Sequence, residues 1–251
     1  MKKNILLGLV AGIVTLFSLA SFAEPVTADY AREKNWADEV VPGLVIGDPV
    51  YLQTPRGHHK FLTLFTPVAG TGKAAIVVHG MGIHPDWGMV GTLRTELADR
   101  GFATLSIQMP VLAADAKSEA YPPTFPEAAE RIAEAVAFLK AKGYAQLAVV
   151  SHSMGSRMSR AYLIDKPDAA VKSWASLGIS VDDYAGIKMP ALDLYGDNDL
   201  PGVLVNAQQR KSSLKAAGSR QQVIVHADHF YTGHEAEMVA AVADFLNATL
   251  K

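Results

Sequence analysis

From residue 74 onward, the chain alternates between short apolar runs and segments with helical periodicity. The apolar runs are continuous, which is typical of strands that are buried on both faces of a parallel sheet. Alternation of such strands with helices predicts an α/β fold whose mostly parallel central sheet carries helices on both faces. The expected strands are residues 74–78, 103–107, 147–150, 173–179, 191–195 and 222–225, and the expected helices are residues 92–100, 126–142, 154–164, 201–217 and 234–250.

The pattern before residue 74 is weaker. The runs 49–54 and 60–67 flank a Pro-Arg-Gly-His turn and predict an antiparallel hairpin. Residues 24–42 are polar and lack a clear period, so we expect an irregular arm on the surface of the domain. The helix expected at residues 126–142 places Arg131 with other charged residues on its solvent-facing side.

The first 23 residues have the pattern of a secretory signal peptide. Two lysines precede an apolar run at residues 5–19, and the small residues Ser21 and Ala23 stand at the −3 and −1 positions of a cleavage site before Glu24. An uncleaved membrane anchor is the alternative, but the apolar run is short for a membrane span. Cleavage predicts an exported protein, periplasmic or secreted, in which residues 24–251 form one domain with no stable membrane span.

Composition and charge exclude several classes of function. Loss of the two lysines in the signal changes the formal net charge from −2 to −4, and no basic cluster is present, so neither nucleic acid nor an anionic membrane is expected as a partner. The chain has no cysteine, which excludes disulfides, thiol nucleophiles and cysteine-ligated metals. The histidines lack metal-binding spacing, and dinucleotide and Walker motifs are absent, so we expect no metal and no cofactor.

A serine stands at an abrupt strand-to-helix junction. The sequence Ser-His-Ser-Met-Gly at residues 151–155 follows the strand 147–150 directly, and a helix begins at once. Such a turn holds the hydroxyl of Ser153 clear of both elements, at a helix N-terminus where developing negative charge is favoured. Small residues are needed two positions before and after this serine; Gly155 meets the need, and Ser151 stands where glycine is usual.

A serine hydroxyl becomes nucleophilic only when a base removes its proton, and the base in turn needs an acid to orient it. Two histidines follow the last expected strand. His229 lies in a loop that can reach back over the sheet, so it is the expected base. His226 is closer to the strand and suits a packed or structural role.

Several carboxylates are candidates for the orienting acid. Asp199 follows the strand 191–195 and can face the histidine as the chain enters the next helix, so it is the expected acid. Asp197 is the second candidate, although it can instead cap its own turn. Asp182 and Asp183 are a third possibility, and their simpler interpretation is that of solvated loop charges.

An oxyanion site requires two backbone N–H groups. Met154, directly after the serine, can supply one, and the glycine-containing turn at residues 79–82 can supply the other, with Met81 as the expected donor. His79 is expected to be packed and hydrogen-bonded rather than chemically active. Trp87 is a candidate substrate-binding residue that could line an acyl or alcohol pocket, although an aromatic residue at a helix start is more often part of the core.

The order serine, aspartate, histidine is that of α/β-hydrolases, and residues 24–251 resemble that superfamily over nearly all of their length. The resemblance implies an α/β-hydrolase fold and a serine hydrolase that uses Ser153, Asp199 and His229. It is carried by the segments 77–80, 151–155, 194–199 and 228–230. A narrower resemblance, to a little-characterised exported bacterial branch, is carried by residues 79–87, 93–94 and 101–110.

The linkers indicate an open site. Only residues 180–190 join the strand 173–179 to the strand 191–195, which leaves no room for a lid domain. Residues 111–125 contain Tyr-Pro-Pro and form a stiff loop that could wall one side. A small molecule or an acylated partner is the expected substrate. We therefore expect an exported hydrolase of carboxylic esters or related acyl bonds that forms an acyl-enzyme on Ser153; the alternatives are an acyltransferase with the same three residues and a catalytically silent binding module.

Overall fold

A computed structural model describes residues 27–165 and 167–251 of the chain. The predicted signal peptide and its cleavage site lie outside the described residues. Within the described residues, no helix has both the length and the apolar character that a membrane crossing requires.

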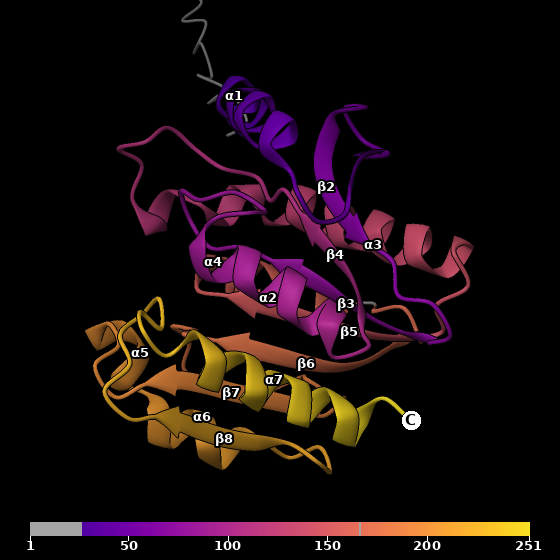
Figure 1. Cartoon of the computed structure of the whole chain (residues 1–251). Helices are drawn as coiled ribbons and strands as arrows, with labels where there is room; N and C mark the ends of the chain where they lie inside the picture. Colours follow the sequence, from indigo (N-terminus) through magenta and orange to yellow (C-terminus); the bar gives the residue numbers. More distant parts are fainter. Residues whose placement is uncertain (1–26, 166) are drawn as a thin grey trace, which may run out of the picture.

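The centre of the molecule is an eight-stranded sheet in the order β1-β2-β4-β3-β5-β6-β7-β8 (Figure 1). β2 runs antiparallel to both of its neighbours, whereas β3 to β8 are parallel, so the predicted fold class and the predicted hairpin are confirmed. The strands are β1 Asp48–Gln53, β2 Lys60–Thr66, β3 Lys73–Val78, β4 Ala103–Ile107, β5 Gln146–His152, β6 Val171–Leu177, β7 Ala191–Gly196 and β8 Arg220–Ile224.

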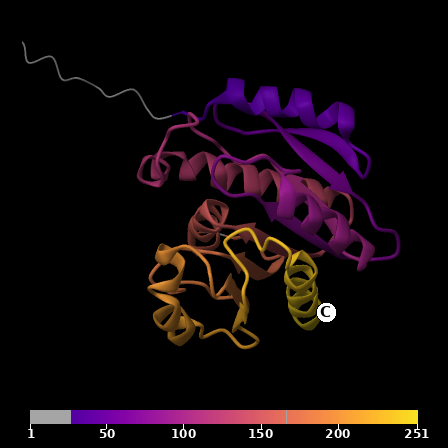
Figure 2. The ribbon, with the colours of Figure 1, turned by 60° about the vertical axis from the view of Figure 1, so that its left-hand side comes forward.

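Helices cover both faces of this sheet. One face carries α2 (Gly88–Asp99) and α7 (Glu235–Thr249), and the other carries α3 (Phe125–Ala141) and α4 (Met154–Asp165) (Figure 1). The remaining α-helices are α1 (Tyr30–Val40), α5 (Pro201–Leu204) and α6 (Ala207–Ser213), and short 3-10 turns span Val41–Gly43, Ser118–Ala120 and Pro122–Thr124. Figure 2 shows α1 beside the β1–β2 hairpin, at the opposite end of the molecule from the C-terminus.

The two faces of the sheet bury separate apolar clusters. In β3, Ile76 and Val78 pack towards α3 and α4, whereas Ala75 and Val77 pack towards α2 and α7. All four side chains are at most 1% exposed. Because both faces of the strand are covered, every position favours an apolar residue, which explains why the strand sequences lack a two-residue period.

The N-terminal arm is a helix and not the irregular segment that we expected for residues 24–42. α1 begins after Asp29, whose carboxylate accepts the backbone N–H of Arg32 at 3.0 Å. The buried residues of α1 are Glu33 and Ala37, so only one of the two is apolar. The prediction was wrong because a charged residue, Glu33, anchors the helix together with the apolar Ala37.

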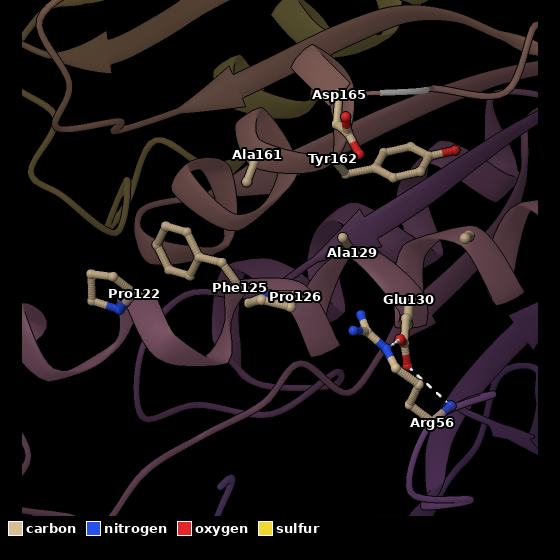
Figure 3. Close-up of a pocket in the computed structure, with 10 residues that line it drawn as sticks. Arg56, Pro122, Phe125, Pro126, Ala129, Glu130, Ala161, Tyr162 and Asp165 are labelled. Carbon is tan, nitrogen blue, oxygen red and sulfur yellow. Dashed lines mark hydrogen bonds and ion pairs between the residues drawn. The ribbon is translucent and has the colours of Figure 1, made fainter. Parts of the chain in front are cut away.

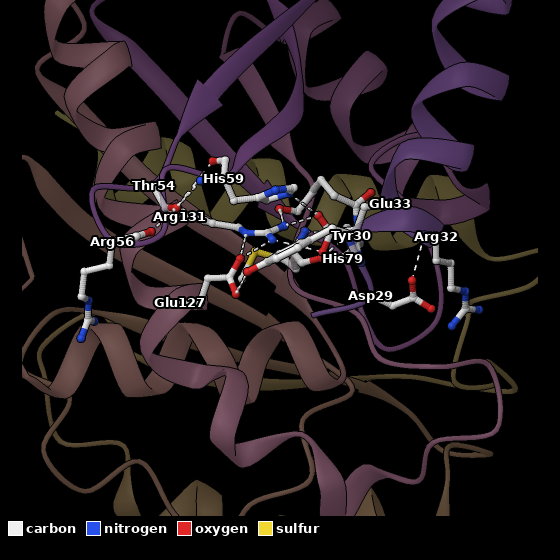
Figure 4. A network of polar contacts seen from close by, with 12 residues as sticks. Asp29, Tyr30, Arg32, Glu33, Thr54, Arg56, His59, His79, Glu127 and Arg131 are labelled. Atoms are coloured by element: carbon white, nitrogen blue, oxygen red, sulfur yellow. Dashed lines mark hydrogen bonds and ion pairs between the residues drawn. The ribbon is translucent and has the colours of Figure 1, made fainter. Parts of the chain in front are cut away.

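That anchor is an ion-pair network between Glu33 of α1 and Arg131 of α3 (Figure 4). Arg131 is fully buried and donates to both carboxylate oxygens of Glu33, at 2.9 and 3.1 Å. It also donates to the carboxylate of Glu127 and to the carbonyl oxygen of Gln108. The solvent-facing placement predicted for Arg131 is therefore wrong, because its partner lies 98 positions away in the sequence.

The helix expected at residues 201–217 is broken into α5 and α6. Arg210 of α6 is fully buried and pairs with the carboxylate of Asp193 on β7 at 3.0 Å. It also donates to the carbonyl oxygen of Val203, at 2.6 Å, and so satisfies an acceptor at the end of α5. The break lets the charged side chain of Arg210 reach the sheet. Apolar periodicity does not predict such a break.

Candidate active site

Three side chains that the sequence singles out meet at the carboxyl edge of the parallel strands, where ligands of such sheets bind. Ser153 follows β5, Asp199 follows β7 and His229 follows β8. The Nε2 atom of His229 lies 2.9 Å from the Ser153 hydroxyl oxygen, and its Nδ1 atom lies 2.5 Å from a carboxylate oxygen of Asp199. When Nδ1–H donates to the aspartate, Nε2 is free to accept the serine proton.

Ser153 occupies the strained turn that its flanking sequence predicts. Its φ of +53° lies in the left-handed region, which residues with a Cβ rarely adopt. Its backbone N–H donates to the carbonyl oxygen of Leu177 at 2.8 Å, which ties the turn to β6. A Cβ on Gly155 would lie 2.2 Å from the carbonyl oxygen of His79, so this position requires glycine.

Ser151, which replaces the usual glycine, fits without disturbing the turn. Its side chain is buried and donates to the hydroxyl of Ser156 at 3.0 Å. It also accepts the indole N–H of Trp174 at 2.8 Å. The hydroxyl thus lies in a satisfied polar cluster beneath the turn, and the departure from the usual motif leaves the geometry of Ser153 intact.

The imidazole of His229 is held in a tight, largely buried position. His229 is 8% exposed and Asp199 is 5% exposed. Asp199 also accepts the backbone N–H of Leu200 at 2.7 Å, which fixes its carboxylate. Gly178 lies against both groups: its φ is +57°, and a Cβ there would come within 3.0 Å of the imidazole and 3.3 Å of the carboxylate. Sequence reasoning missed this glycine because the expected strand 173–179 includes it, whereas β6 ends at Leu177.

His152 is a second residue that the sequence analysis did not assign. It is buried, and its Nε2–H donates to the backbone carbonyl of His229 at 2.9 Å, while the two imidazoles lie 4.7 Å apart. Burial lowers the pKa of His152 to about 3, so its ring is neutral at physiological pH. A neutral ring adds no positive charge beside His229 and instead supports the loop that carries it.

His79 has the packed, hydrogen-bonded role that the sequence predicts. Its Nδ1–H donates to the carbonyl oxygen of Gly80 and its Nε2 accepts the N–H of Met109, both at 2.8 Å. Burial lowers the pKa of His79 to about 3, which keeps the ring neutral. These bonds fix the turn after β3. The turn passes close to the serine, since a Cβ on Gly80 would lie 3.1 Å from the Cβ of Ser153.

The alternative acids and the alternative base do not reach this cluster. Asp197 is exposed, and its carboxylate accepts the backbone N–H of His226 at 2.5 Å. The side chain of His226 is exposed, and the φ of this residue, +67°, shows that it forms a turn. His226 therefore has a structural role in that turn but does not pack in the core. Asp182 and Asp183 bond to other side chains at the surface.

A cavity of about 270 Å³ opens beside Ser153. The segment that joins β6 to β7 contains no helix or strand, so no separate lid domain covers the cavity. Its lining residues are Met81, Ser118, Ser153, Met154, Arg157, Gly178, Ser180, Leu200, Gly202, Val203 and His229. Both residues expected to supply oxyanion N–H groups therefore line the cavity, and Ser118 brings the predicted 111–125 loop to its wall.

Trp87 is not among these lining residues. Its ring packs edge-on against Phe230, with ring centroids 5.1 Å apart, and it lies against the apolar cluster beneath α2 and α7. The structure therefore gives Trp87 a packing role, the alternative that we weighed against substrate binding.

A larger groove of about 580 Å³ lies between α3 and α4 (Figure 3). Arg56 and Glu130 form an ion pair at its edge, and aromatic and proline side chains make up much of its wall. Its lining contains no serine, histidine or oxyanion turn, so the smaller cavity is the candidate active site. Among residues 27–165 and 167–251, no group of three histidine or acidic side chains is arranged to hold a metal ion.

Comparisons with known proteins agree with this architecture. Residues 52–129 match a family model described as "Protein of unknown function (DUF3530)". The rat protein ABHD14B, provisionally described as a protein-lysine deacylase, is 27% identical over 158 residues, which are 59% of this chain and 72% of that protein.

Similar solved structures cover most of the chain. The dienelactone hydrolase from Anabaena variabilis aligns with a TM-score of 0.67 and 18% identity, over 81% of this chain and 99% of that one. An esterase from Pyrococcus furiosus aligns with a TM-score of 0.63 and 15% identity, over 82% and 97%. An α/β serine hydrolase homologue from Coxiella burnetii aligns with a TM-score of 0.63 and 16% identity, over 80% and 98%. The chain therefore has the α/β-hydrolase fold.

Proposed function

We propose that the protein is a serine hydrolase that cleaves carboxylic esters or related acyl bonds through an acyl-enzyme on Ser153. The observation that carries this proposal is the continuous hydrogen-bonded chain from Ser153 through His229 to Asp199, beside an open cavity. Hydrolase and esterase descriptions among the structural neighbours support the same class of reaction.

The geometry supports a two-step reaction. The Ser153 oxygen forms a bond to the substrate carbonyl carbon while its proton passes to Nε2 of His229, and the Asp199 carboxylate stabilises the imidazolium that results. The N–H groups of Met81 and Met154 stabilise the negative charge on the carbonyl oxygen. The bond to the leaving alcohol then breaks, and His229 protonates that alcohol. Water repeats the sequence, releases the acid and restores the Ser153 hydroxyl.

Experiments can distinguish this hydrolase from two alternatives, an acyltransferase and a catalytically silent binding module. An acyltransferase would pass the acyl group from Ser153 to an alcohol instead of water, so product analysis with and without added alcohols separates the two. The rat relative's description makes acylated lysine a specific second substrate to include. A catalytically silent binding module would show no acyl-enzyme chemistry at all.

A fluorophosphonate probe tests the proposal directly. We expect one covalent adduct on Ser153, located by peptide mass spectrometry, because only an activated serine attacks phosphorus at a useful rate. Ser153→Ala should abolish labelling, and His229→Ala should slow it by roughly 100-fold or more, the range expected for loss of a general base. Ser212→Ala, at an exposed position of α6, is the matched control and should label normally. Absence of labelling in folded protein would favour the silent module.

We also propose that the mature protein is exported and begins at Glu24. This proposal is supported by the two lysines at the start of the chain, the apolar run that follows them, and the small residues Ser21 and Ala23 at the −3 and −1 positions. Expression of the full chain in a bacterium should give a periplasmic or secreted product whose intact mass corresponds to residues 24–251. Ala23→Arg should block this processing and leave the longer chain in the membrane fraction. A wild-type product that retains Met1 and stays with the membrane would contradict cleavage.

A further inference from the structure

The candidate active-site cavity contains one side chain with a fixed charge. Among its described lining residues, Arg157 alone is permanently ionised, whereas the rest are apolar side chains, glycines, serines and the imidazole of His229. No carboxylate lines this cavity in the part of the chain that the structure describes. The cavity therefore presents a positive charge to whatever enters it.

Arg157 lies one helical turn beyond the proposed nucleophile. Its backbone N–H donates to the carbonyl oxygen of Ser153 at 3.3 Å, which ties the first turn of α4 to the serine. Both residues line the same cavity, so the side chain of Arg157 is available to a substrate whose carbonyl Ser153 attacks.

The guanidinium of Arg157 has no carboxylate at ion-pair distance among residues 27–165 and 167–251. It makes weak contacts with the sulfur of Met154, at 3.9 Å, and with the ring of Phe125, 5.8 Å from the guanidinium carbon. By contrast Arg160, on the next turn of α4, pairs with Asp183 at 3.1 Å. Arg157 is only partly exposed, so water solvates it less fully than a surface arginine.

The acidic residues nearby have other contacts. Asp182 accepts a hydrogen bond from Asn206 at 2.7 Å, and Asp183 is the partner of Arg160. Glu119 is exposed and accepts the Ser118 hydroxyl at 3.0 Å. Asp182 and Asp183 line an adjoining hollow together with Arg157. Hydrogen bonds from its own backbone and from Ser118 lower the pKa of Glu119, and the nearby charge of Arg157 lowers it in part as well. None of the three carboxylates forms an ion pair with Arg157, so its donors remain available to a ligand.

We propose that Arg157 binds a carboxylate at the far end of the substrate's acyl group, so that the preferred substrates are monoesters of short dicarboxylic acids. The inference rests on the proposed acyl-enzyme function. The acyl group stays bonded to Ser153 until water releases it, so it must occupy the cavity that Ser153 and Arg157 share. A volume of about 270 Å³ is at the lower limit of small-molecule pockets, which favours a short chain. Guanidinium and carboxylate match in shape and charge and can form two parallel hydrogen bonds.

The test compares two esters of equal chain length, the 4-methylumbelliferyl monoester of glutaric acid and the 4-methylumbelliferyl ester of valeric acid. We expect wild-type kcat/KM to be at least about 10-fold higher for the glutarate ester, since one hydrogen bond between charged groups contributes roughly 10- to 100-fold. Arg157→Gln should remove this preference, so that the ratio of kcat/KM for the two esters falls to about one. Arg157→Lys should keep part of the preference, because a charge remains without the planar fork.

Arg160→Gln is the matched control, because Arg160 lies on the same helix but outside the lining of this cavity. It should leave the ratio of the two rates unchanged. Free glutarate gives a second readout: it should inhibit valerate-ester hydrolysis competitively in wild type and not in Arg157→Gln. Wild-type inhibition by glutarate does not depend on whether a variant folds.

The outcomes separate the two proposals. If the valerate ester is cleaved and Ser153 is labelled, but wild type shows neither a preference for the glutarate ester nor inhibition by glutarate, the assignment to Arg157 is overturned and the hydrolase stands. Equal loss of preference in Arg157→Gln and Arg160→Gln would also overturn it. If neither ester is cleaved and no serine is labelled, the proposed function is wrong. The inference about Arg157 is then wrong as well, because it depends on that function.

Discussion

Replacing Asp199 with asparagine should lower kcat/KM for ester hydrolysis by about 10⁴, the scale of loss when an orienting aspartate becomes an amide. The carboxylate oxygen that accepts Nδ1–H of His229 also accepts the backbone N–H of Leu200. An asparagine that keeps its oxygen on both donors supplies no negative charge to stabilise the imidazolium. One that turns its amide N–H towards the histidine loses the Leu200 bond and favours the wrong tautomer. Nε2 would then carry a proton and could no longer accept one from Ser153. Steady-state hydrolysis of the valerate ester measures the effect.

Asp197→Asn is the matched control for this experiment. Asp197 lies two residues away, is exposed, and bonds to the backbone of His226 rather than to the ring of His229. We expect a change of less than about threefold in kcat/KM, as for an ordinary surface substitution. Thermal melting of both variants should remain close to wild type. If Asp197→Asn lost more activity than Asp199→Asn, the acid would be misassigned and the site would need a different histidine geometry.

The candidate site was predictable because its signals are local in the sequence. Ser153 stands in a small-residue turn between an apolar strand and a helix, and Asp199 and His229 each follow an apolar strand of their own. Parallel strands bring their carboxyl ends to one edge, so three local signals converge without any knowledge of distant contacts. The choice of Asp199 over Asp197 was the only step that depended on side-chain direction, and the structure places Asp199 beside the histidine.

Features that depend on contacts between distant charges were not predictable. Glu33 is one of the two buried residues of α1, and its partner Arg131 has the sequence position of a solvent-facing residue in its own helix. Arg210 is similar, since its pairing with Asp193 breaks a helix whose periodicity is otherwise continuous. Periodicity measures the hydrophobic face of a single element and carries no information about charge pairing across 17 or 98 residues.

Residues that support the site were missed for a different reason. Gly178 and His152 act through shape and position: one leaves room for the imidazole of His229, and the other donates to its backbone. Neither residue carries out a chemical step, so motif reasoning gives them no role. Arg157 was missed because a lone arginine in a helix is most simply interpreted as a surface charge, and only the cavity lining shows otherwise.

Replacing Arg131 with methionine should lower the free energy of unfolding by about 3–5 kcal/mol, the usual cost of removing one partner from a buried ion pair. Glu33 is 4% exposed and would lose both of its guanidinium hydrogen bonds (Figure 4). The carbonyl oxygen of Gln108, at the end of β4, would also lose its donor. Urea-induced unfolding followed by circular dichroism measures the difference, and α1 should become the first segment to exchange its amide protons.

Arg100→Met provides the comparison that separates burial from charge. Arg100 pairs with Glu96 at 3.0 Å on the surface of α2, and both side chains are more than a third exposed. Because solvent screens such a pair, its loss should cost less than about 1 kcal/mol. Adding Glu33→Gln to Arg131→Met should recover part of the stability, since no uncompensated charge then remains at position 33. If Arg131→Met cost no more than Arg100→Met, the network of Figure 4 would contribute little, and α1 would have to be held by its other contacts, such as Ala37 against Leu62 and Leu64.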